Sequence, residues 1–501
     1  MDFNLDYITH SLGLIKPELA ISLALVWLVL SDLILSKDKT ILPYIGLIGL
    51  FAAGFYILQE WGISSFASPN PSGGMLAVDN FGSFFKLIII LATFLVILFS
   101  ISSSEIKSAF DRHGEYYALI FGMVLGMFFM VSAVDLILIY LSIELVSLSS
   151  YVLAGFTKNS LRNSEASLKY VIYGGAASGI MLFGISIIYG ITGSTNLYTI
   201  HSVLQAAQVP VGALMLSGIL IFTGIGFKIS AAPFHFWAPD VYEGAPITIT
   251  AYLSVASKAA GFALLIRFIK ITFIQSVNAD GYWQMLNLID WKSFFILISI
   301  LTMTLGNFAA LWQDNMKRLL AYSSIAHAGY ILLGLAVLSN QGMMAVLIYF
   351  AVYAIMNLGA FFVVMLIANK IGSENIDDYK GLGYSTPLLG ISLAIFLVSL
   401  TGLPPTAGFI AKLYLFMALV DAKMIVVAII ALLNTVVSLY YYIRVLKNMY
   451  LSKAETPVPS FSASLGNKIL VVVMLIPVIL LGIYFTPLVQ WAQSSVSLLG
   501  F

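Results

Sequence analysis

Fourteen apolar runs of about 20 residues follow one another along this chain of 501 residues. They cover approximately 17–36, 41–60, 80–101, 114–133, 134–155, 166–191, 211–230, 248–270, 293–312, 318–338, 342–369, 386–420, 424–447 and 467–488. A helix of about 20 apolar residues crosses the roughly 30 Å hydrocarbon core of a bilayer. The sequence therefore predicts an all-α membrane protein with about 14 transmembrane helices, without a soluble domain between them.

The composition agrees with this class and excludes several others. Hydrophobic residues make up 60% of the chain and charged residues 9%, against roughly 25% charged residues in soluble proteins. Cysteine is absent, which excludes disulfides, iron–sulfur ligation and thiolate metal sites. No zinc, phosphate-loop, nicotinamide or flavin motif occurs, and a net charge of +1 does not indicate a nucleic-acid partner. We expect no cofactor, no metal and no redox chemistry in this chain.

The distribution of lysine and arginine predicts the orientation. With the N-terminus outside, 14 of these residues fall in inward loops and 5 in outward loops. The inward set is Lys37, Lys39, Lys107, Arg112, Lys158, Arg162, Lys317, Arg318, Lys370, Lys380, Arg444, Lys447, Lys453 and Lys468. Because basic residues accumulate in cytoplasmic loops, we expect both termini on the outer side.

Three lysines and one glutamate inside the apolar runs lie far from easy reach of the membrane surface: Lys228, Lys258, Lys412 and Glu144. A charge at membrane depth costs about 2.5–3.5 kcal/mol on insertion scales, so such residues usually serve a function. Both residue types can bind and release a proton, which makes the four residues candidates for a proton relay. In the structural alternative, Glu144 is a neutral acid bonded to a nearby serine or to the backbone, and the lysines form fixed ion pairs.

Three further residues are candidates with a stronger structural alternative. Lys169 lies near the inner end of its segment, where it either extends to the membrane surface or tunes Glu144 as an ion partner. His235 follows Pro233, and His327 could connect the two halves of the chain. Each histidine is either a relay member or a core residue with satisfied hydrogen bonds.

Prolines interrupt the helical pattern at two places. Pro233 lies just after the seventh apolar run, and Pro404 and Pro405 lie inside the twelfth. Proline removes a backbone donor and clashes with the preceding turn, so we expect both helices to be discontinuous. Paired broken helices indicate inverted repeats with an ion pathway between them. An uninterrupted shift of 177 residues places His235 on Lys412 and Arg267 on Arg444.

The expected organisation follows from these repeats. Residues 1–112 form an N-terminal segment of three helices, and residues 113–270 form a first repeat of five helices. Residues 271–448 form a second repeat of five helices, inverted relative to the first, and residues 449–501 carry the last helix.

Four segments together resemble the antiporter-like membrane subunits of respiratory complex I, which is NADH-quinone oxidoreductase. They are 142–155 (SIELVSLSSYVLAG), 165–170 (EASLKY), 227–246 (FKISAAPFHFWAPDVYEGAP) and 402–412 (GLPPTAGFIAK). The chain is most similar to the subunit N branch. It has no room for the long lateral helix of subunit L, and Lys412 stands where subunit M typically has a glutamate.

The resemblance implies a role for each matching residue. Glu144 would be the carboxylate of the fifth helix, with Lys169 as its modulating partner. Lys228 and Lys258 would be the central lysines, and Lys412 the lysine of the outward half. Quinone reduction elsewhere in the complex would drive protons through these groups, while NADH, flavin, iron–sulfur clusters and quinone would bind to other subunits.

Two other functions remain open from the sequence. The chain could be a subunit of a multi-subunit sodium/proton antiporter, or a non-pumping structural membrane subunit. The resemblance implies other complex I membrane subunits as partners and the bacterial inner membrane as the location. The electron donor, the quinone and the choice between H⁺ and Na⁺ are not determined by the sequence.

Overall fold

In the computed structural model, residues 11–35, 39–66, 74–157, 161–206, 208–286, 288–453 and 461–500 are described. The N-terminal helices are α2 (Lys16–Ile34), α3 (Leu42–Glu60), α4 (Asn80–Ser102) and α5 (Ser104–Lys107), followed by the 3-10 turn Phe110–Arg112. Next come α6 (His113–Ser132), α7 (Leu136–Ala154), α8 (Leu161–Thr192), α9 (Leu197–Ala206), α10 (Val211–Ile229), α11 (Trp237–Gly244), α12 (Ile247–Tyr252), the π-helical segment Leu253–Ser257 and α13 (Lys258–Phe273).

The second half continues with α14 (Trp291–Ala310), α15 (Met316–Ala336), α16 (Asn340–Ile371), the 3-10 turn Ile376–Tyr379, α17 (Leu382–Ser385), α18 (Pro387–Thr401), α19 (Ala407–Asp421) and α20 (Ile425–Tyr450). The chain closes with α21 (Leu465–Ile483) and α22 (Thr486–Ser494). Two antiparallel hairpins, β1 (Ser65–Phe66) with β2 (Ala77–Val78) and β3 (Ile274–Val277) with β4 (Trp283–Met285), lie outside the helical spans.

The membrane-spanning helices confirm the predicted all-α class. Within the described residues, 13 helices are long and apolar enough to cross a membrane, with α12, the π-helical segment and α13 acting as one. The short helices α18 and α19, of 15 residues each, lie on either side of the second break and together account for the predicted fourteenth span. The chain is therefore a multi-pass membrane protein.

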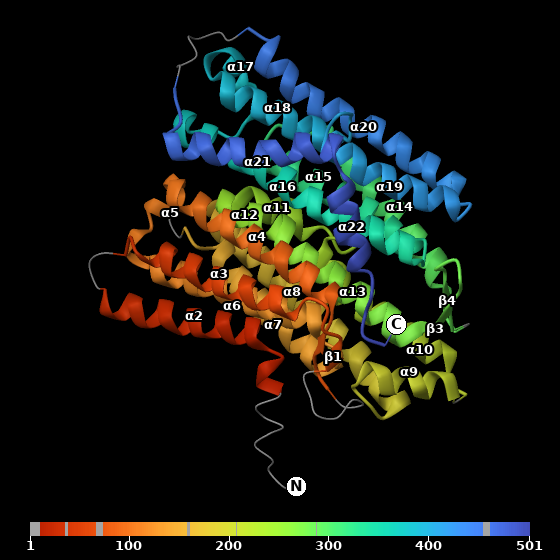
Figure 1. The fold of residues 1–501 in the computed structure, drawn as a ribbon. Helices are drawn as coiled ribbons and strands as arrows, with labels where there is room; N and C mark the ends of the chain where they lie inside the picture. The colour runs from red at the N-terminus through yellow and green to blue at the C-terminus, as the bar shows by residue number, and fades with distance from the viewer. Residues whose placement is uncertain are drawn as a thin grey trace.

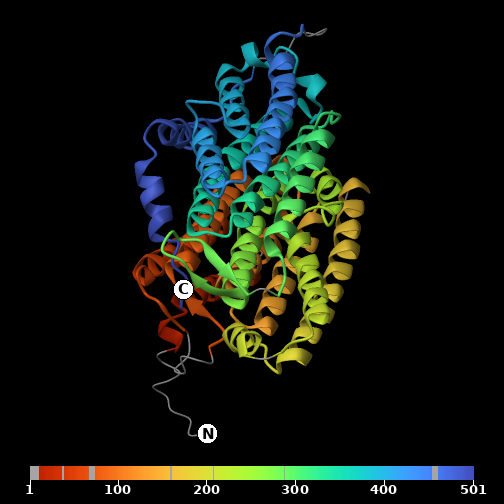
Figure 2. The same cartoon turned by 90° about the vertical axis from the view of Figure 1, so that its right-hand side faces the viewer.

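The helices form one bundle whose most buried members lie at its centre (Figures 1 and 2). In the span 247–273, 100% of the residues of the apolar stretch are buried. In α15 and in α16 the share is 94%. Peripheral helices such as α8, α20 and α21 instead expose large apolar side chains, as lipid-facing helices do. Charged groups on the central helices are therefore shielded from lipid by protein.

Both predicted breaks are present. The first helix half, α10, ends at Ile229, Ser230 adopts a left-handed conformation with φ +58°, and α11 starts only at Trp237. In the second break α18 ends at Thr401, Gly402 has φ +88°, and α19 starts at Ala407. Side chains satisfy part of the freed backbone, as unwound turns inside a membrane require.

The hydrogen bonds that do this come from neighbouring helices. The backbone N–H of Ala232 donates to Thr302 Oγ1 at 2.9 Å, and Trp237 Nε1 donates to the carbonyl oxygen of Phe227 at 3.0 Å. In the second break, Lys412 Nζ donates to the carbonyl oxygen of Thr401 at 2.7 Å. The two breaks are thus held by protein groups, with Lys412 itself bonded to the last residue of α18.

A repeated set of backbone hydrogen bonds relates the two halves. The bonds from Leu136 N to Thr195 O and from Leu197 N to Val134 O, both 2.9 Å, clamp the start of α7 to the end of α8. The bonds from Met316 N to Glu374 O and from Ile376 N to Asp314 O, both 2.8 Å, clamp α15 to α16 in the same way. Likewise, α8 packs against α10 and α11, and α16 packs against α18 and α19.

The uninterrupted shift of 177 residues is only partly correct. It holds for Arg267 and Arg444, which donate to the equivalent carbonyl oxygens of Val131 and Leu311. It is wrong for the breaks, because the left-handed residues Ser230 and Gly402 lie 172 positions apart. From the left-handed residue to the arginine the second half is five residues longer, since Arg444 lies 42 positions after Gly402 and Arg267 lies 37 positions after Ser230. Helix α19, with 15 residues, is also longer than α11, with eight. His235 and Lys412 are therefore not equivalent when the chain is counted from the breaks.

Loops from distant parts of the chain gather at the two ends of the bundle. Figure 1 shows α5 and α17 at one end and the β3–β4 hairpin at the other. The end with α5 carries Lys107, Arg162, Lys317 and Lys370 of the predicted inward set, since these residues line adjoining pockets there. Lys37 and Lys158 of the same set lie outside the described residues.

Candidate functional site

Lys228 and Glu144 begin a row of buried ionisable groups. Lys228, in the last turn of α10, is 1% exposed, and its Nζ donates to Ser147 Oγ at 3.2 Å. Ser147 lies one turn after Glu144 on α7, so the ammonium and the carboxyl occupy the same side of that helix. They interact electrostatically, but no ion pair within 4.0 Å joins them.

The structural alternative for Glu144 has no support from the neighbouring serines. Its Oε1 atom is buried and has no hydrogen-bond partner among the described residues. Ser142 donates to the carbonyl oxygen of Ile139 instead, and Ser147 accepts from Lys228. An unpartnered carboxyl oxygen beside a buried ammonium leaves room for a proton or a water between them.

Lys258 comes next in the row, at the point where the π-helical segment Leu253–Ser257 passes into α13. Its Nζ donates to the carbonyl oxygen of Ser324 at 2.8 Å and to Ser324 Oγ at 2.7 Å. The hydroxyl of Tyr353 donates to the same Oγ at 2.9 Å. Among the described residues no carboxylate lies within ion-pair distance, so the fixed ion pair of the structural alternative has no support for Lys258 there. π-helical turns are frequent at functional sites.

His327 lies one turn after Ser324 on α15 and is bonded on both sides. Nδ1 lies 2.7 Å from the hydroxyl of Tyr349, and Nε2 lies 3.5 Å from the hydroxyl of Tyr442. Tyr442 in turn lies 2.5 Å from Ser323 Oγ. Because a neutral imidazole has one donor and one acceptor nitrogen, two hydroxyl partners can satisfy it in either tautomer.

Lys412 ends the row. Besides its bond to Thr401, its Nζ lies 3.4 Å from Thr435 Oγ1 and 4.6 Å from the ring centre of Tyr330. Cation–π contacts of this kind are worth about 2 kcal/mol when desolvated. Tyr330 lies one turn after His327 on α15 and its hydroxyl is 3.1 Å from Thr435 Oγ1.

One face of α15 therefore connects the second and third lysines. Ser324, His327 and Tyr330 follow at intervals of three residues, which places them on one side of the helix. Ser324 touches Lys258, Tyr330 touches Lys412, and His327 lies between them. These hydroxyl partners were missed by the sequence analysis, because buried serine and tyrosine are common in membrane helices and carry no charge signal.

Two predicted site residues stand apart from this row. Lys169 does not contact Glu144: its side chain is 37% exposed and forms ion pairs with Glu165 at 2.7 Å and Asp240 at 2.6 Å. The predicted pairing with Glu144 is wrong in this structure, because Lys169 extends from the inner end of α8 to acidic groups at the surface. His235 lies in the first break, 6% exposed, and its Nδ1 has no hydrogen-bond partner among the described residues.

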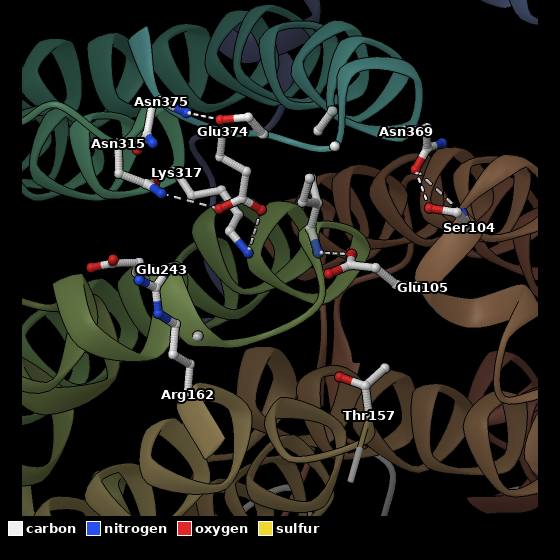
Figure 3. Close-up of a pocket in the computed structure, with 15 residues that line it drawn as sticks. Ser104, Glu105, Thr157, Arg162, Glu243, Asn315, Lys317, Asn369, Glu374 and Asn375 are labelled. Atoms are coloured by element: carbon white, nitrogen blue, oxygen red, sulfur yellow. Dashed lines mark hydrogen bonds and ion pairs between the residues drawn. The ribbon is translucent and has the colours of Figure 1, made fainter. Parts of the chain in front are cut away.

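A polar cavity of about 410 Å³ opens at the predicted inner end (Figure 3). Lys317 and Glu374 form an ion pair of 2.8 Å beside it. The carboxylate of Glu105 accepts the backbone N–H of Ile247, the first residue of α12, at 2.9 Å. The cavity thus lies directly over the start of the span that carries Lys258. In the described part of the chain, no group of three or more His, Asp or Glu residues could hold a metal ion.

Comparisons with known proteins agree on one family. Residues 133–438 match the family model described as NADH:quinone oxidoreductase/Mrp antiporter, TM. NADH-quinone oxidoreductase subunit N 2 of Chloroherpeton thalassium is 48% identical over 490 residues, which is 97% of this chain and 94% of that relative. The predicted branch is therefore confirmed at the level of the sequence.

Solved structures share the fold. A chain of the respiratory complex I from Thermus thermophilus has a TM-score of 0.77 and 29% identity, covering 95% of this chain and 98% of that chain. A chain of the Mrp complex from Dietzia sp. DQ12-45-1b has a TM-score of 0.82 with 97% of both chains covered, but 19% identity, so it shows the fold alone. The chain therefore belongs to the NADH:quinone oxidoreductase/Mrp antiporter transmembrane family and, within it, to the subunit N branch of NADH-quinone oxidoreductase.

Proposed function

We propose that this chain translocates protons across the membrane as a subunit of NADH-quinone oxidoreductase, driven by quinone reduction elsewhere in the complex. The observation that carries the proposal is the row of buried groups that runs from Glu144 through Lys228, Lys258 and His327 to Lys412. Glu144 is partly buried and the other four groups are buried. Each of these four has a hydroxyl, carbonyl or ring partner that can orient a proton.

Charge repulsion supplies the coupling in this proposal. The row has three ammonium groups and one carboxyl, and in the described part of the chain Lys258 and Lys412 have no acidic partner within ion-pair distance. Two like charges in a poorly screened interior disfavour each other. A proton that arrives on Lys258 therefore favours proton loss from Lys228 or Lys412. A change in charge at one end of the row is passed to the other end by this repulsion.

Hydroxyl groups bridge the lysines. Ser324 and Tyr353 form a bonded pair beside Lys258, and Tyr349 and Tyr442 flank His327. Water between these groups would complete a path for protons, since the intervals between the lysines exceed one hydrogen bond. His235 enters as an accessory group on the first break, and we place Lys169 in the surface ion cluster with Asp240 and Arg318 rather than next to Glu144.

The wider arrangement follows the sequence prediction. We place both termini on the outer side of the bacterial inner membrane, with the 410 Å³ cavity facing the cytoplasm. Residues 113–270 and 271–448 act as the two repeats, flanked by the N-terminal three helices and the last helix. Other membrane subunits of the complex are the partners, and NADH, flavin, iron–sulfur clusters and quinone belong to other subunits.

The two alternative functions are less well supported. A sodium/proton antiporter subunit agrees with the shared fold, but the 48% identity to a subunit N chain favours the redox-driven complex. A purely structural anchor would be expected to pair its buried charges, whereas Lys258 and Lys412 lie among hydroxyl groups and a tyrosine ring.

The test is pumping by the intact complex with Lys228→Ala. The purified complex is reconstituted in liposomes, and quinone reduction and proton uptake are measured together. We expect both to fall well below half of the wild-type rates while the complex still assembles, because alanine is a good helix former. The control is Lys292→Ala, which removes an exposed lysine in the first turn of α14. Normal pumping by an assembled Lys228→Ala complex would show that the lysine is structural.

A further inference from the structure

The N-terminal three helices bury a second ionic cluster, separate from the row described above. Glu18 is in the first turn of α2, Glu60 is the last residue of α3, and Lys86 is in the second turn of α4. These helices pack side by side at one flank of the bundle (Figure 1). The three residues are 2%, 4% and 2% exposed. Lys86 Nζ forms an ion pair with Glu18 Oε1 at 2.6 Å.

The cluster has one carboxyl more than it has cations. Glu18 Oε2 and both carboxyl oxygens of Glu60 are buried and have no hydrogen-bond partner among the described residues. Glu60 interacts electrostatically with Lys86, Glu18 and Lys16, but Lys16 is exposed at the surface. Lys86 is therefore the single buried ammonium for two buried carboxyls.

The helices around the cluster provide no second counter-charge. Helix α6 packs against α2, α3 and α4 and contributes the ring of Phe128, 5.7 Å from Lys86 Nζ. The ionisable residues of α6 lie at its opposite end, between His113 and Tyr117. Helix α13, another neighbour of α4, carries three buried cations that are engaged elsewhere. Arg267 is paired with Asp79, Lys258 is bonded to Ser324, and Lys270 lies over the ring of Trp283 and donates to the carbonyl oxygen of Val496 at 3.5 Å. An unpaired buried carboxylate costs several kcal/mol, so the second carboxyl is expected to hold a proton.

A polar stripe leads from this cluster along α4. Lys86, Thr93 and Ser100 follow at intervals of seven residues, which places them on one face of the helix, and all three are buried. Thr93 Oγ1 lies 2.8 Å from the hydroxyl of Tyr252, the last residue before the π-helical segment that precedes Lys258. Seven residues span about 10.5 Å along a helix, so water must complete the connection.

We propose that Glu18, Glu60 and Lys86 form a proton-binding site in which one of the two carboxyls holds a proton and exchanges it with the membrane surface at which α2 begins. Proton binding by the cluster does not depend on the proposed function of the chain. The use of this site does depend on the proposed function. On that basis, we infer that protons reach α4 through Tyr252 and that the site releases them to the outer side.

Infrared difference spectroscopy of the purified complex tests the binding. The C=O stretch of a protonated carboxyl counts the protons held by the cluster in each variant. Wild type should hold one. Glu60→Gln and Glu18→Gln should each hold none, because the remaining carboxylate then pairs with Lys86 alone. Lys86→Gln should hold two, because neither carboxyl retains a cation.

Controls keep this count interpretable. Lys16→Gln removes the exposed lysine of the same helix, and Asp280→Asn removes an exposed carboxyl of the β3–β4 loop; both should leave the band of the cluster unchanged. If one glutamine variant fails to assemble, the other makes the same prediction. An unchanged band in both Glu60→Gln and Glu18→Gln would overturn the proposal.

Pumping by the same variants tests the use of the site. Glu60→Gln should slow proton release at least fivefold in the reconstituted complex, while Lys16→Gln should not change it. If the band disappears in Glu60→Gln but pumping is normal, the cluster binds a proton and the inferred release role is wrong. Normal pumping by Lys228→Ala would contradict the proposed function without affecting the proton count of the cluster.

Discussion

The ion pair of Asp79 and Arg267 should be the most sensitive structural contact of the chain. Arg267 Nη1 and Nη2 donate to the two carboxyl oxygens of Asp79, each at 2.8 Å, and Nε donates to the carbonyl oxygen of Val131 at 2.8 Å. Asp79 also caps α4 by accepting the N–H of Gly82 at 2.8 Å, and it accepts the N–H of Leu499 at 3.2 Å. One carboxylate thus joins α4, α13 and the C-terminal residues.

The perturbation is a double-mutant cycle of Asp79→Asn and Arg267→Leu. Both side chains are at most 2% exposed, and removal of one partner from a buried pair costs about 3–5 kcal/mol, because the other charge stays buried and unpaired. Asparagine caps helices about as well as aspartate, so Asp79→Asn isolates the loss of charge. The double variant leaves no unpaired charge and should be more stable than either single variant.

Heat-induced loss of the assembled complex is a suitable assay, followed on native gels after incubation at a series of temperatures. The expected order of midpoints is wild type, then the double variant, then the two single variants. Asp377→Asn is the control, because its pair with Lys380 is 3.5 Å long and 78% exposed on the aspartate side, and such pairs contribute at most about 1 kcal/mol. A double variant less stable than both single variants would refute the argument from unpaired charge.

Three further predictions follow from other parts of the structure. Burial raises the pKa of Asp79, but Arg267 and the hydrogen bonds outweigh it and hold the pKa below the usual 3.8. The contribution of Asp79 to stability is therefore complete above pH 3.8 and is lost only as the pH falls below that value. The midpoint difference between wild type and Asp79→Asn should then be constant between about pH 8 and pH 5. A Cβ on Gly482 would meet the carbonyl oxygen of Pro405 at 1.9 Å. Gly482→Ala should therefore lower the stability of the protein by about 3 kcal/mol and lower the midpoint of heat-induced loss. Gly466→Ala on the same helix is the control, because open space surrounds Gly466, and it should leave the midpoint unchanged. A reporter fused after residue 501 should be active only on the outer side, and activity only in the cytoplasm would contradict the orientation inferred from lysine and arginine.

The helical framework was predictable because each span must satisfy its own backbone in lipid. Apolar length alone located 13 continuous spans, and the prolines at 233, 404 and 405 located both breaks. The length of the helix after each break was not predictable, since α11 and α19 differ by seven residues without a clear sequence signal. The uninterrupted repeat shift failed at that point.

The site was predictable where charge made it conspicuous. Lys228, Lys258, Lys412 and Glu144 stood out because a buried charge is costly. Their hydroxyl partners on α15, α16 and α20 depend on how helices distant in the sequence pack together. Lys169 shows the limit of this reasoning: the family resemblance implied a pair with Glu144, but Glu165 and Asp240 hold its ammonium.

The two repeats place different chemistry at equivalent positions. Glu144 and Ser147 lie nine and twelve residues after Asp135, the residue that caps α7, and Ser324 and His327 lie nine and twelve residues after Asn315, which caps α15. Ser324 in the second half therefore takes the position that Glu144 has in the first half, and His327 takes the position of Ser147. Lys228 has an acidic neighbour, whereas Lys258 has only hydroxyl and carbonyl partners at the corresponding place. The first lysine of the row therefore has an acidic neighbour, whereas the second and third have no carboxylate within ion-pair distance among the described residues. In the proposed relay, this difference between equivalent positions would give proton transfer a direction.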